Sequence, residues 1–468
     1  MPYYLKLGTL PKKRHTEFRR PDGALYSEEV FGTEGFVGPT STLYHIHPPT
    51  QVYGWKTLYS TAAEYVEKDV MRMRHLKSQN MTAEGDPLTG RKIVLGNEDC
   101  ELALCLPKEQ MAYHYKNGQG DELLFIHHGS GTCYTMFGAL EFHEKDYIVI
   151  PKGTIYRIEF NDLPDDKRPS SYSKDDLPLG KFLVVETRNA SHFAPPPRYL
   201  SKSTSQFLEH APYCERDLRT PEFPMTFDES GDHEVRVKAR DRMHSYTYHY
   251  HPLDVVGWDG CYYPYIFNID DFSPITGELH MPPPIHQTFE AHNFVICSFC
   301  PRKLDFHPRA IKVPYNHSNL DSDEVLYYVE GNFGSRKGID VGSFTAHPQG
   351  IPHGPHPGTV EKSMAHDYTA ELAVMVDTFR PLYPTKLALE LDDENYPASW
   401  QGEHFPGLSD SDRAKLNGHA KFPATQDGNA ELINANNTHT VEGKPTGRIH
   451  EQPGYTPPAN PAPTPASQ

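Results

Sequence analysis

Short apolar runs separated by glycine and proline recur along most of the chain. In the first half LLFIHHGSG, YTMFGALEF, DYIVIPKGT and YRIEF follow one another, and FLVVETR continues the series. In the second half the runs are NFVICSF, EVLYYVEGNF, GSFTAH and AELAVMVDTF. Runs of this length with turn residues at each break are typical of antiparallel strands. The pattern predicts a mainly β protein whose strands form barrel walls.

Three other stretches break this pattern. Residues 61–74 have the periodicity of an amphipathic helix, and we expect a helix there. Residues 161–180 are polar and rich in proline, which predicts a surface loop within the first barrel. Residues 401–468 lose apolar periodicity and end in PGYTPPANPAPTPASQ. Such a tail cannot bury enough apolar surface to offset its ordering entropy, so we expect disorder at its end.

Two stretches of the chain share one order of histidine, glutamate, glycine and proline, with equal intervals from the glutamate to the glycine and from the proline to the last position. The first copy contains His114, Glu122, Gly129, Pro151, Gly153 and Tyr156. The second copy contains His317, Glu324, Gly331, Pro348, Gly350 and His353. The repeat predicts two related halves, at residues 1–255 with a barrel at about 110–190, and at residues 256–400, followed by the tail.

The second copy has the residues of a metal site. Two histidines and one carboxylate on neighbouring strands form a face that suits a non-haem ferrous ion and leaves positions open for oxygen and substrate. Asp323 could replace Glu324 as the carboxylate, but the spacing to Gly331 matches the first copy only for Glu324. Strand alternation then turns Asp323 outward. His317, Glu324 and His353 are therefore the predicted ligands.

The first copy lacks the last ligand, because Tyr156 stands where the second copy has His353. A neutral phenol is a poor ligand for ferrous iron, and Lys152 and Arg157 add positive charge nearby. We therefore interpret the first barrel as degenerate.

The early pair His45 and His47 has no carboxylate at a suitable distance in the sequence, and we interpret it as structural.

Composition narrows the possible function classes. The net charge of −17 argues against partners such as nucleic acid or an anionic membrane surface. Seven scattered cysteines form no zinc-binding pattern, and Cys297 and Cys300 are interpreted as buried thiols. The N-terminus has no apolar signal core, and no apolar run approaches the roughly 20 residues of a membrane span. These features predict a soluble cytoplasmic protein.

Several segments together resemble one family. They are KRHTEFRRPDGALYSEEVFGTEGF, LYHIHPPTQV, HHGSGTCYTMFGAL, DYIVIPKGT, PPPIHQTFEAHNFVICSF and PHGPHPG. They resemble homogentisate 1,2-dioxygenases, particularly bacterial forms, across most of the chain outside the tail. The resemblance implies a bicupin whose second half binds one Fe(II). It also implies a homo-oligomer that opens the ring of homogentisate, a small aromatic hydroquinone acid, with O2 to give maleylacetoacetate in tyrosine and phenylalanine catabolism.

The resemblance also implies roles for individual residues. The family's iron ligands fall on His317, Glu324 and His353, with His353 also facing the substrate. The family's general base falls within LHMPPPIHQTF, on His280 or His286, and matching the prolines favours His280. His347 matches a pocket histidine that faces the substrate, although a strand histidine with satisfied hydrogen bonds would look the same.

One departure from the family bears on the substrate. The family's substrate-contacting tyrosine falls on Phe333, which lacks the hydroxyl, and Tyr315, Tyr327 or Tyr328 could supply it instead. For the substrate carboxylate the candidates are Arg336, Lys337 and backbone amides near Gly334. Three alternatives stay open. Phe333 favours the first, a related bicupin dioxygenase acting on another hydroquinone or catechol acid such as gentisate. The second is a non-catalytic bicupin that binds a small ligand, and the third is a metal-dependent isomerase with the same ligands, which would consume no oxygen.

Overall fold

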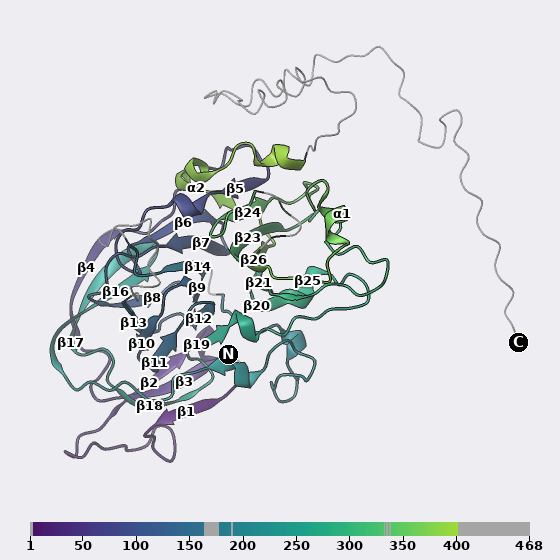
Figure 1. Cartoon of the computed structure of the whole chain (residues 1–468). Coiled ribbons are helices and arrows are strands. Elements are labelled where there is room, and N and C mark those ends of the chain that lie inside the picture. Colours follow the sequence, from purple (N-terminus) through teal and green to yellow (C-terminus); the bar gives the residue numbers. More distant parts are fainter. Residues whose placement is uncertain are drawn as a thin grey trace, which may run out of the picture. The chain divides into compact units, whose positions relative to one another are not determined.

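The computed structural model describes residues 3–162, 177–188, 191–331, 333, 336 and 338–400. The predicted disordered tail and most of the predicted loop at 161–180 lie outside these residues. Nearly all regular structure in the described part is β (Figure 1), as the apolar runs predicted. In the described part, helices are too short or too polar to cross a membrane.

Three large sheets contain most of the strands. One has seven strands in the order β11 (Gly138–Phe142), β10 (Gly131–Thr135), β13 (Ile155–Phe160), β8 (His114–Asn117), β16 (Ser230–Ala239), β17 (Arg242–Tyr250) and β4 (Val52–Ser60). The next has eight, in the order β15 (Leu218–Arg219), β19 (Tyr265–Asn268), β12 (Asp146–Ile150), β9 (Glu122–His128), β14 (Lys181–Thr187), β7 (Cys100–Cys105), β6 (Arg91–Gly96) and β27 (Tyr383–Pro384). The third has six, in the order β20 (Gln287–Ala291), β21 (Phe294–Phe299), β26 (Leu372–Thr378), β23 (Asp323–Glu330), β24 (Phe344–His347) and β5 (Arg74–Leu76).

The smaller elements surround these sheets. A four-stranded sheet contains β1 (Leu5–Gly8), β18 (Val255–Gly260), β3 (Thr40–His45) and β2 (Ser27–Gly32). A two-stranded sheet pairs β22 (Arg302–Lys303) with β25 (Tyr368–Thr369). The α-helices are α1 (Thr359–Ser363) and α2 (Lys386–Leu391). The 3-10 helices are η1 (Glu34–Phe36), η2 (Ser78–Asn80), η4 (Pro197–Tyr199), η5 (Glu215–Asp217), η6 (Ile269–Asp271), η7 (Pro283–His286) and η8 (Tyr396–Trp400).

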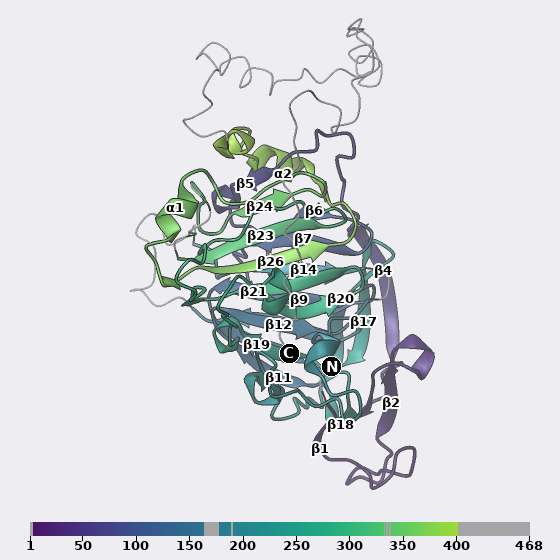
Figure 2. The ribbon, with the colours of Figure 1, turned by 90° about the vertical axis from the view of Figure 1, so that its right-hand side faces the viewer.

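The eight-stranded sheet lies between the seven-stranded and the six-stranded sheets (Figure 1), and the six-stranded sheet faces the viewer in Figure 2. Alternate side chains of β9 point to opposite faces, as strand geometry requires. Leu124 and Ile126 pack with residues of the seven-stranded sheet, whereas Leu123 and Phe125 pack with residues of the six-stranded sheet. Both faces of this sheet are buried, which explains its nearly continuous apolar runs. The protein is a bicupin, with the two barrel units packed through their sheets.

The two halves exchange strands. β5, from the first quarter of the chain, pairs with β24 at the edge of the six-stranded sheet. β27, from the end of the second half, pairs with β6 at the edge of the eight-stranded sheet. The boundary between residues 255 and 256 stays a prediction, because these exchanged strands connect the units on either side of it.

The predicted helix at 61–74 is wrong. Residues 61–73 contain no helix and lead into β5. Tyr65 forms an isolated bridge with Thr385, and its hydroxyl donates to Glu101 at 3.1 Å. A single short helix is marginal in water, so these long-range contacts outweigh the local periodicity.

His45 lies at the end of β3, where it contacts two carboxylates. Its Nδ1 is 2.7 Å from Asp254 and its Nε2 is 3.0 Å from Glu29. Burial opposes the charge on this ring, but the two carboxylates outweigh burial and raise the pKa of His45 to about 9. The interpretation of His45 as structural agrees with this geometry.

We expect the thermal stability of the protein to fall between pH 6.5 and 9 through His45. A histidine whose folded pKa is raised contributes stability below its unfolded pKa and loses it as pH rises through the folded value. The interval from 6.5 to about 9 corresponds to about 3 kcal/mol. His45→Gln should flatten the decline of Tm over this range, whereas His15→Gln, at a 97% exposed side chain, should keep it. An unchanged decline in His45→Gln would contradict the assignment.

Candidate metal centre

Glu324 lies on β23, a central strand of the six-stranded sheet. His347 on β24 stands directly opposite it on one side, and Asp377 on β26 stands opposite it on the other. Strand alternation places these three side chains on the face that points away from the middle sheet, because Val325 and Tyr327 point towards that sheet. A row of one histidine and two carboxylates, with Glu324 in the middle, therefore forms the floor of the site.

His317 and His353 lie on two extended segments above this floor. Their backbones form a reciprocal bridge, with His317 N donating to His353 O at 2.8 Å and His353 N donating to His317 O at 2.9 Å. Gly350 makes the preceding turn with a φ of +76°, a conformation that favours glycine. Its N–H donates to Asn319 O at 2.6 Å, which ties the turn to the segment that follows His317. The turn residues of the repeat thus hold both histidines in place.

The structure brings the three predicted ligands together. One nitrogen or oxygen atom of each of His317, Glu324 and His353 lies within 4.8 Å of the others. His317 Nε2 is 3.6 Å from Glu324 Oε2, and His353 Nε2 is 3.8 Å from Glu324 Oε1. Each of these histidines has Nδ1 near a backbone carbonyl, at 3.2 Å from Tyr315 O and 3.0 Å from Ile351 O. A proton on Nδ1 leaves each Nε2 lone pair available for a metal.

Two further observations fit a cation at this position. His353 Nε2 is buried and has no hydrogen-bond partner among the described residues. Burial opposes the charge on Glu324, yet the surrounding histidines hold its pKa well below the usual range. The residues present therefore match the donor set that divalent transition metals prefer.

Asp323 takes no part in this cluster. Its two carboxylate oxygens accept hydrogen bonds from Gln349 N at 2.8 Å and Leu382 N at 2.7 Å. It points away from the ligands, as alternation predicted, but it is buried and fastens the following loops to β23.

His347 contacts both the predicted ligand Glu324 and Tyr396 of η8. Its Nδ1 is 3.1 Å from Glu324 Oε1, its Nε2 is 3.3 Å from the hydroxyl of Tyr396, and its ring stacks on His353 at 4.7 Å. Burial lowers the pKa of His347 to about 4. A neutral ring that donates from Nδ1 to Glu324 and accepts from Tyr396 would fix the orientation of the carboxylate.

The two candidate bases lie on one segment in different surroundings. His280 packs edge-on against Tyr315 at 5.0 Å, and Tyr315 in turn lies 6.0 Å from the ring of His317. His280 Nε2 is buried without a hydrogen-bond partner among the described residues, and burial lowers the pKa of its ring. His286 is almost fully buried against Phe299, and burial lowers its pKa to about 3.

The aromatic residues near the centre divide between two faces. Phe333 packs on Tyr328 at 4.4 Å, and the Tyr328 hydroxyl is 2.9 Å from Thr345 Oγ1. Tyr327 points to the opposite face, where its hydroxyl is 2.9 Å from His127 Nδ1. The prediction that Tyr327 could supply the missing hydroxyl is therefore wrong, whereas Tyr315 and Tyr328 stay candidates.

Sequence patterns missed a second group of residues at the site, on and near η8. Trp400 Nε1 donates to Gly354 O at 3.0 Å, and the guanidinium of Arg336 donates to the same carbonyl and lies 5.5 Å from the Trp400 ring. Tyr396 and Trp400 come from a polar segment with no motif, so only the fold reveals their place. The alternatives Lys337 and Gly334 lie outside the described residues.

The first barrel has a different arrangement at the corresponding position. Arg91 donates to Glu122 at 2.5 Å and to the Tyr156 hydroxyl at 2.9 Å, and that hydroxyl donates to Glu122 at 2.5 Å. Tyr115 also faces Glu122, whereas His114 points to the other side of β8 and packs against His251. The repeat aligned His114 with His317, and this alignment was wrong by one strand position. Tyr115 is the residue of β8 that faces Glu122. A guanidinium occupies the place of a metal, so the first barrel is degenerate.

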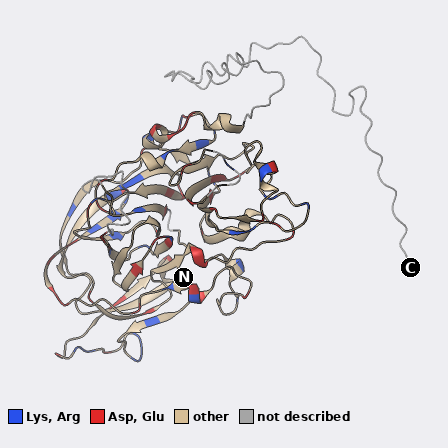
Figure 3. Ribbon diagram, viewed as in Figure 1, with Lys and Arg blue, Asp and Glu red and all other residues tan. Residues whose placement is uncertain are grey.

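Acidic and basic residues are interspersed across the described elements (Figure 3). The positive charge next to Glu122 comes from Arg91 and not from Arg157, which pairs with Glu159 and lies over the Tyr134 ring.

Comparisons with known proteins agree with the geometry. Residues 213–269 match the family model described as "Homogentisate 1,2-dioxygenase N-terminal". The chain is 35% identical over 406 residues to a Saccharolobus solfataricus protein named "Putative dioxygenase", covering 86% of this chain and 99% of that protein. It is 23% identical over 451 residues to the homogentisate 1,2-dioxygenase of Sinorhizobium fredii, covering 86% of this chain and 92% of that protein.

The solved structures to which the chain is similar are more distant. A cupin 2 conserved barrel protein of Leptotrichia buccalis is 9% identical, with a TM-score of 0.30 over 68% of this chain and 100% of that one. An oxalate decarboxylase of Bacillus subtilis is 11% identical, with a TM-score of 0.29 over 67% of this chain and 78% of that one. The family assignment rests on the sequence relatives. By these relatives the chain belongs to the homogentisate 1,2-dioxygenase family and is a ring-cleaving dioxygenase.

Proposed function

We propose that this protein binds Fe(II) through His317, Glu324 and His353 and opens the ring of homogentisate with O2 to give maleylacetoacetate. The observation that carries the proposal is the cluster of three ligand atoms with both Nδ1 positions occupied by backbone carbonyls. Two histidines and a carboxylate occupy one face of a metal ion and leave the opposite face for reactants. Ferrous iron supplies, when bound, the one-electron chemistry that lets O2 react with an aromatic ring.

His280 is the proposed general base. A base needs a neutral nitrogen within reach of the phenol, and His280 has a buried, unpartnered Nε2 and a pKa lowered by burial. Its ring approaches His317 through Tyr315, so a phenol placed beside His317 would lie near it. His286 lies deeper, against Phe299, and is proposed to support the segment that carries His280.

Arg336 is the proposed partner of the substrate carboxylate. Its Nε is buried and has no hydrogen-bond partner among the described residues, although the guanidinium already donates to Gly354. A guanidinium matches the geometry of a carboxylate well. Phe333 then offers the substrate ring an apolar contact where relatives with tyrosine would offer a hydroxyl. For that reason another hydroquinone acid such as gentisate is the second candidate.

Oxygen uptake tests the reaction and the substrate together. The full-length protein, loaded anaerobically with Fe(II), should consume one O2 per homogentisate and consume markedly less with gentisate or 2-methylhydroquinone. The last compound keeps the two phenols but lacks the carboxylate that Arg336 would bind. Equal rates with 2-methylhydroquinone would refute the role of Arg336, and preference for gentisate would select the second candidate. No uptake with any of them despite bound iron would overturn the proposal.

The base is tested by a pair of matched variants. His280→Gln should lower kcat about 100-fold or more, within the range of general base catalysis, with iron content unchanged. His286→Gln should lower thermal stability more than turnover, because it replaces a buried ring. Wild-type turnover in His280→Gln at full iron loading would exclude His280 as the base.

A further inference from the structure

A cavity of 260 Å³ lies inside the first barrel, between the seven- and eight-stranded sheets. Four charged side chains line it, namely Arg91, Glu101, Glu186 and Lys238. Apolar side chains such as Ala103 and Met243 form much of the remaining wall. The exposed residues Ser60 and Thr89 lie at its margin, so the cavity opens towards solvent there. Its size suits a small molecule rather than a drug-sized ligand.

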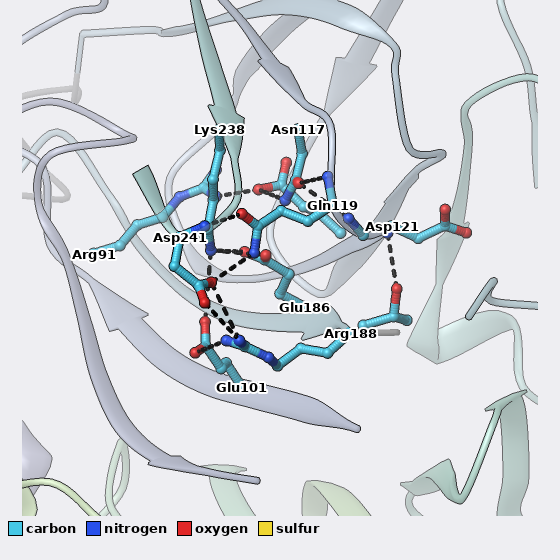
Figure 4. Close-up of polar contacts among 12 residues, drawn as sticks. Arg91, Glu101, Asn117, Gln119, Asp121, Glu186, Arg188, Lys238 and Asp241 are labelled. Atoms are coloured by element: carbon cyan, nitrogen blue, oxygen red, sulfur yellow. Dashed lines mark hydrogen bonds and ion pairs between the residues drawn. The ribbon is translucent and has the colours of Figure 1, made fainter. Parts of the chain in front are cut away.

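The charges in this wall are buried and paired. Lys238 Nζ lies 2.7 and 2.8 Å from the two oxygens of Glu186 and 3.5 Å from Glu101 (Figure 4), and the side chains of Lys238 and Glu186 are 8% and 7% exposed. Arg188 holds Glu101 from the other side and also binds Asp241. Buried ion pairs contribute little net stability compared with apolar packing. Their concentration around a cavity therefore favours a role in binding.

Arg91 rules out a metal ion and leaves donors for an organic ligand. Its guanidinium already neutralises Glu122, and Pro87 O, Glu122 and the Tyr156 hydroxyl accept from three of its N–H groups. An arginine has five such groups, so two stay available beside the cavity. Thr61 adds a further donor on the wall, because its Oγ1 is buried without a hydrogen-bond partner among the described residues. An orphaned hydroxyl on a cavity wall calls for a polar occupant.

Charge balance then selects among polar ligands. Each charged wall residue has a partner of opposite sign, so a ligand with one net charge would add an uncompensated charge inside the barrel, where charges are costly. A net-neutral ligand that carries both signs avoids this cost. Its anionic end would meet Arg91 and Thr61, its cationic end would meet Glu101 and Glu186, and its apolar part would meet Met243 and its neighbours.

We propose that this cavity binds a small zwitterion, an α-amino acid with an apolar side chain, at a site separate from the metal centre. The first barrel would then serve as a ligand-binding module after losing its metal. The proposal does not depend on the substrate of the second barrel.

Calorimetric titration of the full-length protein tests the class of ligand. The probes are L-leucine, 4-methylpentanoic acid, which lacks the ammonium group, 3-methylbutylamine, which lacks the carboxylate, and xylitol, a neutral polyol. L-leucine should bind at least 10-fold more tightly than each of the other three. Equal or tighter binding of any of them, or no binding of L-leucine, would overturn the proposal.

Two variants locate the site. Ala103→Leu should narrow the cavity and abolish L-leucine binding, and Thr61→Val should weaken binding several-fold by removing one hydroxyl. Val30→Ala, at an exposed position on β2, is the matched control and should bind as the wild type does. Circular dichroism and Tm establish that each variant is folded. Unchanged L-leucine binding in a folded Ala103→Leu would place the ligand elsewhere and refute the assignment.

Discussion

Replacing His353 with alanine is expected to abolish both metal retention and ring cleavage. His353 is one of three candidate ligands, its side chain is fully buried, and its Nε2 has no other partner among the described residues. Changes to residues that only support a ligand typically cost 10–100-fold in metal affinity, so loss of a ligand should cost about 100-fold or more. Elemental analysis and oxygen uptake after iron loading measure the two effects.

The Tm of His353→Ala tests the loss of metal without relying on turnover. A bound metal stabilises the folded state by about 2.7 kcal/mol at 100 times its Kd, so a chelator should lower the Tm of the wild type. His353→Ala should show no further decrease with chelator. His366→Ala, at an exposed histidine, is the control and should retain metal and activity. Full metal content and turnover in His353→Ala would exclude His353 as a ligand.

Replacing Arg91 with methionine is expected to produce the largest loss of stability. Glu122 is fully buried, and burial opposes its charge, while Arg91 and the Tyr156 hydroxyl hold its pKa below the usual value. Removing one partner of a buried pair costs about 3–5 kcal/mol, because the other charge is left uncompensated. For a cooperative unit of roughly 400 residues this corresponds to a decrease in Tm of about 4–6 °C.

A second substitution separates charge from packing. Arg91→Met combined with Glu122→Gln should recover a large part of the lost Tm, because no buried charge then lacks a partner. Arg157→Met is the matched control: its side chain is 37% exposed and pairs with Glu159, and such pairs contribute at most about 1 kcal/mol. Equal Tm values for Arg91→Met and Arg157→Met would show that the guanidinium does not hold Glu122.

The sequence predicted those parts of the site that depend on local spacing. His317, Glu324 and His353 come together because glycine and proline turns fix the neighbouring strands, and alternation separates Glu324 from Asp323. The strands were predictable for the same reason, since period-two patterns and turn residues act over a few positions.

Features that depend on contacts between distant segments were not predictable. The repeat predicted His114 as the inward residue of β8, whereas Tyr115 is the one that faces Glu122. Both residues are plausible inward residues until the partner strand is known. Arg91 reaches Glu122 from another strand, and Tyr396 reaches His347 from the end of the described chain. The stretch at 61–74 has helical periodicity, but the bridge between Tyr65 and Thr385 and the ion pair between Arg74 and Asp392 connect it to distant segments.

The pairing of β5 with β24 has a consequence for biosynthesis. β5 ends at Leu76 and β24 begins at Phe344, so the ribosome completes one partner long before the other. At about 5–20 residues per second, β5 would wait on the order of 15–50 s for its partner. During that interval its backbone groups form an open edge that can pair with other chains. Slower translation or crowded expression should therefore increase aggregation of the nascent protein, and chaperones that shield strand edges should raise its yield.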